Sequence, residues 1–501
     1  MTVSFSNTLK DLPATCILPI IANERLAEIL EQIAQMSDLN ASLLQADFKA
    51  EQGDVQTIYQ GEKRFYLLGL GKGNDFSKTV KTFRSFAHKI KDKSPSKIGL
   101  GLFHCQYEGK LENLLEAAVN GLELATYQIG HYKNTSKTEA HPLKNEEAGL
   151  VIGLTNEVTD SIRQAVEKGH QIAQAQLSIM ELVNMPGNKK TPTEMASWAL
   201  RLAQESGYKA TVFEKAQIEE IGLHALLAVN RGSEYPPVFI VLEYTPSNVP
   251  LEGLKTVGLV GKGVTFDTGG ISIKPSANMH YMKSDMGGAA AVLGTFEAAA
   301  RLQLPVRLVG AIPVTDNAVD AKSIRPGDVI DSYSGKTIEV IDTDAEGRLI
   351  LADGLAYILK HFQPDTLIDA ATLTGSTVRT FGYQIGGLFS NNDDLAEALF
   401  QAGERTGERI WRLPIWDIFN DDIKSDIADV RNYSGKPTAG AIGAAKFLEA
   451  FINDHPRWAH LDIAGVAFGD SEFSSQKSAT GFGIRLLVDF LMASIARPKS
   501  A

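Results

Sequence analysis

Carboxylate side chains cluster in three short, glycine-rich segments of the sequence. The segments are residues 261–270 (GKGVTFDTGG), 282–290 (MKSDMGGAA) and 342–349 (DTDAEGRL). Divalent cations accept carboxylate oxygens as ligands, and two neighbouring cations need several of them. The candidate ligands are Asp267, Asp285, Asp344 and Glu346. Their negative charges would balance two divalent cations, so the three segments together predict a site for two metal ions.

The segment 342–349 carries the strongest charge signal. Asp342, Asp344 and Glu346 lie close together in sequence, and carboxylates this near repel one another. A surface loop would relieve the repulsion with water, whereas a buried loop needs cations. Apolar residues flank the segment on both sides and favour the buried alternative, in which Arg348 neutralises only one of the charges.

Two members of the candidate site have structural alternatives. Asp285 precedes a small-residue segment that predicts a helix, so its carboxylate could instead accept backbone N–H groups as a helix cap. Lys262 carries an ammonium group, which cannot bind a metal, and most lysines lie at the surface. Beside two dications in a dry site its pKa would fall, and the neutral amine could then coordinate.

Strands that alternate with helices must position these segments. After Pro192, strands are expected at 210–213, 238–243, 256–260, 306–312, 337–341 and 366–368, and helices at 193–206, 289–302, 349–361 and 394–406. This alternation predicts a mostly parallel sheet with both faces covered by helices. In such sheets, ligands lie beyond the carboxyl ends of the strands. Two of the acidic segments follow expected strands and would reach that edge.

The chain of 501 residues exceeds the size at which one core stops growing, so two α/β domains are expected. We predict a smaller, mixed-sheet (macro-like) N-terminal domain over residues 1–155, a linking helix and loop over 156–190, and a larger catalytic domain over 191–501. The first domain should contain strands at 64–70, 97–103 and 147–154 and a helix at 111–124. Its glycines Gly69, Gly71 and Gly73 are weak evidence for phosphate binding, and a strand-end turn is the preferred interpretation.

Composition narrows the class of protein. Hydrophobic residues make up 44% and charged residues 22% of the chain, as in ordinary globular proteins, and the net charge of -11 disfavours nucleic acid and anionic membranes as partners. No signal peptide or membrane-spanning apolar run is visible, so a cytoplasmic protein is expected. Cys16 and Cys105 form no motif and are expected to be reduced, buried thiols. No H-E-x-x-H, G-x-S-x-G or Walker motif occurs.

The motif TDAEGRL at 343–349 resembles the signature of the leucyl (cytosol) aminopeptidase family, peptidase family M17. GKGVTFDTGG and MKSDMGGAA are similar to two further blocks of that family. Weaker similarities extend from Leu182 to Leu487, among them DAATLTG from Asp369 and WAHLDIAG from Trp458. The resemblance implies an enzyme that removes the N-terminal residue, leucine or another mostly apolar one, from peptides with a free N-terminus.

The resemblance also implies how two metal ions, Zn²⁺ or Mn²⁺, would be held in each subunit. The ligands of the first ion would be Asp267, Asp344, with its backbone oxygen, and Glu346. The ligands of the second would be Lys262, Asp267, Asp285 and Glu346. A water bridging both ions would attack the scissile bond. The family is usually a hexamer, which implies a homohexamer here.

Further residues match positions with a role in catalysis or binding. Lys274 and Arg348 match the two catalytic positions: Lys274 would stabilise the oxyanion and Arg348 would hold a bicarbonate ion near Leu373. The positions that would line the substrate pocket are Met282, Thr372, Gly375 and Ala464.

Three residues depart from the family's usual pattern. Asp342 replaces the usual Asn, which adds a charge beside the site and should tune metal binding. Thr268 replaces a common Ser and keeps the hydroxyl, and Ala467 replaces a larger Met in some relatives, which would widen the pocket.

The alternative function is a catalytically silent or DNA-associated regulator on the same fold. The acidic charge and the complete ligand set argue against it, and a gel-shift assay at physiological salt would discriminate.

Overall fold

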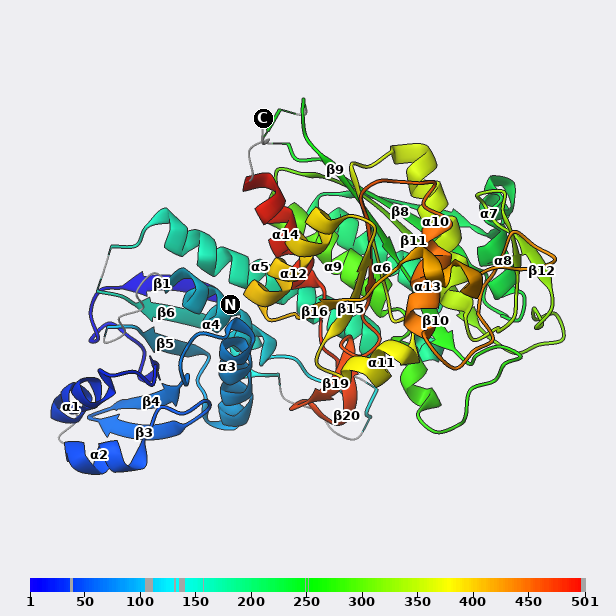
Figure 1. The fold of residues 1–501 in the computed structure, drawn as a ribbon. Helices are drawn as coiled ribbons and strands as arrows, with labels where there is room; N and C mark the ends of the chain where they lie inside the picture. Colours follow the sequence, from blue (N-terminus) through cyan, green and yellow to red (C-terminus); the bar gives the residue numbers. More distant parts are fainter. Residues whose placement is uncertain are drawn as a thin grey trace. The chain divides into compact units, whose positions relative to one another are not determined.

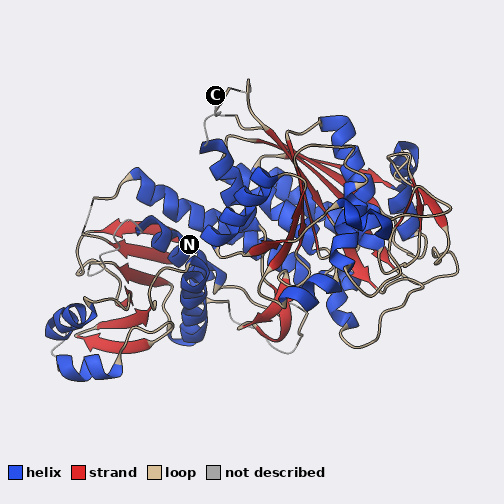
Figure 2. Ribbon diagram, viewed as in Figure 1, coloured by secondary structure: helices blue, strands red, loops and turns tan. Residues whose placement is uncertain are grey.

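The computed structural model describes residues 1–36, 39–103, 111–129, 132–134, 140–155, 157–247, 249–250 and 252–496. The chain forms two compact units, residues 1–174 and 175–501 (Figure 1). The chain passes from one unit to the other within helix α5 (Asp160–Asn184), so the boundaries expected at 155 and 190 stay a sequence-based prediction. Both units are α/β, as predicted, and Figure 2 shows helices packed around the strands of each.

A six-stranded mixed sheet forms the centre of the N-terminal unit, in the order β1-β6-β5-β2-β4-β3. All neighbours are parallel except β3 and β4, which form a hairpin. The strands are β1 (Thr2–Ser6), β2 (Thr15–Ile20), β3 (Val55–Gln60), β4 (Lys63–Gly69), β5 (Lys97–Gly101) and β6 (Gly149–Gly153). Helices α3 (Phe76–Ile90) and α4 (Leu111–Leu124) share an apolar core with one face of the sheet. Helices α1 (Leu26–Met36) and α2 (Ala41–Asp47) share a second core with the other face.

The glycine-rich turn and Cys16 agree with their structural interpretations. Gly71 and Gly73 have φ angles of 58° and 62°, in the left-handed region that favours glycine, and they form the turn after β4. The Cys16 thiol is fully buried, and burial raises its pKa to about 11, which makes it unreactive. Cys105 lies outside the described residues.

The larger unit is built on a mixed, mostly parallel sheet in the order β16-β15-β18-β14-β9-β11-β8-β7. Its centre, from β18 to β11, is parallel, whereas β8, β7 and β15 are antiparallel to their neighbours toward the centre. The strands are β7 (Lys209–Glu214), β8 (Val238–Tyr244), β9 (Thr256–Gly261), β11 (Arg307–Asn317), β14 (Thr366–Ala371), β15 (Gly386–Ser390), β16 (Ile410–Arg412) and β18 (Trp458–Asp462). Smaller sheets are formed by β12 (Val329–Asp331), β13 (Thr337–Glu339) and β17 (Val430–Arg431), and by β19 (Phe468–Ser471) and β20 (Ser474–Ala479).

Helices cover both faces of this sheet, as expected. On one face lie α6 (Pro192–Ser206), α9 (Gly287–Arg301), α12 (Asp393–Thr406) and α14 (Ile484–Ala496), and on the other lie α8 (His224–Asn230), α10 (Glu346–Phe362) and α13 (Gly440–Glu449). Neighbouring positions on β9 show the two faces, since Gly261 abuts Ala289 of α9 and Val260 abuts Gly354 of α10. Two short helices, α7 (Lys215–Ile221) and α11 (Gly375–Phe381), complete the unit.

The sheet extends further at its functional edge than the sequence predicts. Strand β11 continues to Asn317, and its extension pairs in parallel with β10 (Gly263–Asp267), a strand that the sequence analysis does not predict. A turn follows at Gly269 and Gly270, whose φ angles are 88° and 66°. Pairing with a strand distant in sequence is not visible in local residue patterns, which explains the difference. None of the described helices is long and apolar enough to cross a membrane.

Glu297 of α9 generates a prediction about stability. Its side chain is 1% exposed; one oxygen lies 2.9 Å from the Arg301 guanidinium, and the other is buried without a hydrogen-bond partner among the described residues. Burial raises the pKa of this carboxyl from 4.5 to about 7. The folded state therefore holds the proton more tightly than the unfolded chain. The stability that this proton contributes is present below about pH 4.5 and is lost as the pH rises through 7.

We expect Glu297→Gln to raise the thermal unfolding midpoint more at pH 8 than at pH 4.5, because the amide cannot ionise. The free energy of unfolding at pH 8 should rise by roughly 1–3 kcal/mol. Differential scanning calorimetry at both pH values measures this change, with Glu194→Gln, at an exposed position of α6, as a control that should show no such change. An equal shift of the midpoint at both pH values would contradict the prediction.

Candidate metal centre and active site

The predicted site residues meet at the carboxyl edge of the central strands. Lys262 lies between β9 and β10, and Asp267 ends β10. Asp285 follows the short 3-10 helix Met279–Ser284, and Glu346 begins α10. Lys262, Asp267 and Glu346 are each at most 3% exposed. The three acidic segments therefore converge in space, as expected for the two that follow strands.

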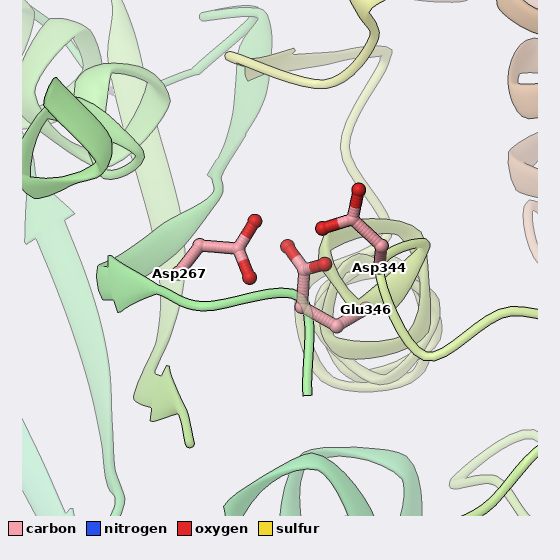
Figure 3. A group of neighbouring side chains, drawn as sticks. All are labelled: Asp267, Asp344 and Glu346. Carbon is pink, nitrogen blue, oxygen red and sulfur yellow. The ribbon is translucent and has the colours of Figure 1, made fainter. Parts of the chain in front are cut away.

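Carboxylate oxygens of Asp267, Asp344 and Glu346 all lie within 4.8 Å of one another. Figure 3 shows the three carboxylates close together, Asp267 from the end of its strand, Asp344 from the loop before α10 and Glu346 from the start of α10. This distance matches a set of oxygens that share one cation. The structure thus brings together the predicted ligands of the first metal ion.

Two lysines pair with carboxylate oxygens of the cluster. Lys262 Nζ lies 2.6 Å from Asp285 Oδ2 and 2.9 Å from Glu346 Oε1. Lys274 Nζ lies 2.8 Å from Asp267 Oδ2 and also pairs with Asp344. Asp285 therefore joins the cluster through Lys262, which brings together the predicted ligands of the second ion. Positive charge is required here because buried carboxylates cannot rely on water to screen their repulsion.

The electrostatics of the cluster favour the binding of cations. Burial, together with the charge of Asp267, raises the pKa of Asp344 to about 7, and burial also raises the pKa values of Asp285 and Glu346. Glu346 Oε2 is buried without a hydrogen-bond partner within the described parts of the chain. A carboxylate oxygen left in this way would gain from a metal ion, so the residues present fit such a group.

The pKa of Lys262 responds to two opposing effects. Burial lowers it, but the carboxylates of Asp285 and Glu346 raise it more, so the net shift is upward. The lowered pKa expected from the sequence depends on two dications beside the amine, which would reverse the effect of the carboxylates.

The alternative role of Asp285 as a helix cap is wrong. Helix α9 begins at Gly287 with Met286 as its N-cap residue, and no side-chain capping hydrogen bond is found among the described residues. The Asp285 carboxylate instead accepts a hydrogen bond from the Thr372 hydroxyl, with 2.8 Å between the oxygens. The helix comes close to the sheet because Gly288 has no side chain: a Cβ there would lie 1.9 Å from the carbonyl oxygen of Ala370. Asp285 is thereby held at the end of β14.

Asn317, at the end of β11, was not predicted as a site residue. Its side-chain amide donates to Asp267 Oδ1 at 2.9 Å and to the carbonyl oxygen of Thr343 at 3.0 Å. The same Asp267 oxygen accepts the Gly269 N–H at 2.8 Å. These bonds occupy Oδ1 and leave Oδ2 directed at the cluster. Asn317 belongs to no motif near the acidic segments, so only the strand pairing reveals it.

Asn432 holds the acidic loop in place at the position where Asp342 replaces the family's usual Asn. Its amide oxygen accepts the Ile341 N–H at 2.8 Å, and its amide nitrogen donates to the Asp342 carbonyl at 2.7 Å. Asp342 Oδ1 accepts the backbone N–H of Asp344 at 2.9 Å. An asparagine oxygen can accept the same bond, so the local structural role of this position survives the change to Asp.

Arg348 is a buried cation with an unused donor. Its Nη1 donates to the carbonyl oxygen of Asn432 at 2.7 Å, while Nε is buried without a hydrogen-bond partner among the described residues. Burial lowers the pKa of this guanidinium, although arginine stays charged at neutral pH. A buried guanidinium N–H without an acceptor favours the binding of an anion beside it.

A cavity of about 750 Å³ opens over the cluster. The predicted pocket residues that line it are Met282, Thr372, Leu373, Gly375 and Ala464, together with Lys274 and Arg348. Ala467 is not among the lining residues; its Cβ packs instead where Gly287 lacks a side chain. The expected widening of the pocket at Ala467 therefore has no support in the cavity wall.

Asp462, at the end of β18, is a second residue that the sequence interpretation missed. Its Oδ1 accepts the N–H groups of Leu373 and Ala464, each at 3.2 Å. Its Oδ2 accepts the hydroxyls of Thr374 and Thr377 at 2.7 and 2.6 Å. One buried carboxylate thus fixes both loops that form this wall of the cavity. Its only sequence signal is its place in the motif WAHLDIAG.

Comparison with known proteins identifies the family. The model of the catalytic domain of the cytosol aminopeptidase family matches residues 178–488, and the model of that family's N-terminal domain matches residues 17–136. The chain belongs to the cytosol aminopeptidase family. It is a leucyl aminopeptidase and a metallo-exopeptidase, as the resemblance of its acidic segments implied.

Individual relatives align with nearly the whole chain. A probable cytosol aminopeptidase of Chloroherpeton thalassium is 41% identical and covers 97% of this chain and 98% of its own. Bottromycin maturation enzyme BotP in complex with Mn is 32% identical with a TM-score of 0.81, covering 96% and 99% of the two chains. A mutant of tomato leucine aminopeptidase is 29% identical with a TM-score of 0.86, covering 98% and 96%.

Asn317→Ala should weaken metal binding by about 10- to 100-fold, because Asp267 loses the donor that orients it. Isothermal titration of Mn²⁺ into the metal-free aminopeptidase measures the effect. Asn230→Ala is the matched control: Asn230 is also buried and donates to Thr315 and Tyr235, but not to a cluster carboxylate. Equal Mn²⁺ affinities of the two variants would contradict the orienting role of Asn317.

Proposed function

We propose that this aminopeptidase cleaves N-terminal residues with two divalent ions held by the buried cluster. The observation that carries the proposal is the convergence of Asp267, Asp344 and Glu346 within 4.8 Å, next to the paired Lys262 and Asp285. A buried group of carboxylates that shares two ammonium contacts has the charge and donor atoms for two dications.

The ligands divide into two sets that share two members. The first set is Asp267, Asp344, with its backbone oxygen, and Glu346. The second set is Lys262, Asp267, Asp285 and Glu346. The contact of Lys262 with both Asp285 and Glu346 supports the second set. Zn²⁺ and Mn²⁺ both suit such ligands, and BotP, a relative, is described in complex with Mn. Bound divalent ions polarise a carbonyl group and lower the pKa of water.

Lys274 and Arg348 act on the substrate and on the proton. The Lys274 ammonium lines the cavity beside Asp267 and Asp344, where it would stabilise negative charge that develops on the scissile carbonyl oxygen. Arg348, with its unused Nε donor, would hold a bicarbonate ion near Leu373, and this ion would relay the proton.

The acidic cluster gives a reason for specificity toward a free N-terminus. With the dications bound, the carboxylate charge would be balanced, and the free α-amine of a peptide would bind as a neutral ligand of the second ion, which an internal peptide bond cannot do. Met282, Thr372 and Ala464 would surround the first side chain, and their small or apolar character favours leucine and other mostly apolar residues. Thr372 is held in place by its bond to Asp285.

We further propose that the chain forms a homohexamer and acts in the cytoplasm. Several large apolar side chains of the catalytic unit are exposed, among them Trp411, Trp416, Ile418 and Ile427, and association between copies would bury such groups. A relative is named a cytosol aminopeptidase, which supports the compartment. Sedimentation equilibrium at a mass of six chains would test the assembly.

Removal of metal should abolish hydrolysis of leucine p-nitroanilide. We expect activity to disappear after EDTA treatment and gel filtration, because the carboxylates alone cannot polarise the substrate. Single re-additions of Mn²⁺, Zn²⁺, Co²⁺ and Mg²⁺, assayed on several aminoacyl substrates, show which ion restores turnover and which side chain is preferred. Full activity without metal, or no activity with any ion and substrate, would overturn the proposed function.

Lys274→Ala should lower kcat by roughly 10²–10³, the usual effect of removing one electrostatic donor to an oxyanion. A donor used only in the transition state should lower kcat and kcat/KM to a similar degree. Steady-state kinetics at saturating metal test this, with exposed Lys209→Ala as the control. Near-normal turnover by Lys274→Ala, with its metal content unchanged, would exclude this role.

A further inference from the structure

Arg379 differs from the lysines of the cavity in having no acidic partner among the described residues, and it differs from Arg348 in being exposed. Lys262 and Lys274 are paired with the cluster carboxylates, and Lys436 lies 2.8 Å from Asp422. Arg379 lines the same cavity and is exposed, and no ion pair to it occurs in the part of the chain that the structure describes. Its positive charge is thus available to a ligand.

The guanidinium is directed along the cavity wall by two neighbours in its own helix. Nη2 donates to the Ser376 hydroxyl at 3.1 Å. Nη1 lies 3.5 Å from the position that a Cβ on Gly375 would take, so the group folds back over the glycine at the start of α11. Gly375 and Ser376 both line the cavity. The guanidinium keeps further N–H groups for an acceptor, since it carries five.

The cations exposed in the cavity wall are separate from the buried cluster, in which Lys262 is paired with Asp285 and Glu346. The carboxylates lie buried at its floor, while Arg379 and Lys436 are exposed in its wall. A peptide whose amine lies at the floor extends outward by about 3.3–3.6 Å per residue. Its free carboxylate would then come near the exposed cations if the peptide is short. Longer peptides carry that carboxylate out of a cavity of about 750 Å³.

We propose that Arg379 binds the C-terminal carboxylate of dipeptides or tripeptides and makes them preferred substrates. This inference rests on the proposed function, in which the amine lies at the acidic floor. Guanidinium and carboxylate form paired, charge-assisted hydrogen bonds, which add orientation as well as attraction. Asp342 also lines the cavity, and its negative charge makes a localised cation more important for an anionic substrate.

The experiment compares free acids with their C-terminal amides. We would measure kcat/KM for Leu-Gly, Leu-Gly-Gly and the amide of each, with wild type and Arg379→Gln at saturating Mn²⁺. The wild type should prefer at least one free acid over its amide by about 3- to 10-fold, the range of an exposed to partly buried ion pair. Arg379→Gln should lower this ratio to below about 2-fold. The ratio within each variant cancels any general change in activity.

Two further measurements distinguish binding by Arg379 from a general electrostatic attraction of the cavity for anions. The acid preference of the wild type should decline as NaCl rises, because an exposed ion pair is screened. Lys436→Gln should lower the ratio less than Arg379→Gln, because the charge of Lys436 is shared with Asp422. An equal effect of both variants would contradict the assignment to Arg379.

The possible failures are distinguishable. If the wild type hydrolyses the amides and leucine p-nitroanilide without any acid preference, the inference about Arg379 is wrong and the proposed function stands. A preference that survives in Arg379→Gln has the same consequence. If none of these substrates is hydrolysed with any metal, both the proposed function and the inference are wrong.

Discussion

Carboxylates repel one another most strongly where water is excluded, and the catalytic unit buries several of them at one edge of its sheet. Lys262 and Lys274 supply compensating charge directly within the cluster. Backbone N–H groups and side-chain amides occupy the outward oxygens, as at Asp267. The inner oxygens, including Glu346 Oε2, have few partners. The fold therefore holds a concentration of negative charge that cations stabilise.

Long-range contacts hold these buried carboxylates close together. Asn317, Asn432 and Asp462 each connect loops that belong to different strand ends. None of the three is itself a proposed ligand, yet each has several hydrogen bonds that a smaller side chain would leave unsatisfied. The acidic loop, the turn after β10 and the loop after β14 consequently depend on one another, so substitutions in them should not act additively.

The sequence predicts the elements well because their signals are local. The helix expected at 111–124 is α4 to the residue, and most other expected helices and strands differ only at their ends. The charge of the acidic loop predicts Asp344 and Glu346 as metal ligands. Asp285 was predicted as a ligand only together with the neighbouring residues of its motif, and Lys262 only from the family resemblance. Strand β10 and the supporting Asn317 were missed because their partners are distant in sequence. Long-range pairing depends on the folded sheet and leaves little trace in single segments.

The charge arrangement also explains why one end of a peptide is distinguished from the other. In the proposed complex, the peptide amine binds at the metal cluster and the peptide carboxylate binds Arg379 in the wall, so the two ends of a zwitterionic peptide meet different partners. A reversed peptide would place its cationic amine beside Arg379, where the like charges would repel each other. The proposed orientation is therefore selected by an unfavourable contact as well as by a favourable one. The buried carboxylates that require cations for stability thus act together with Arg379 in the proposed orientation of the substrate.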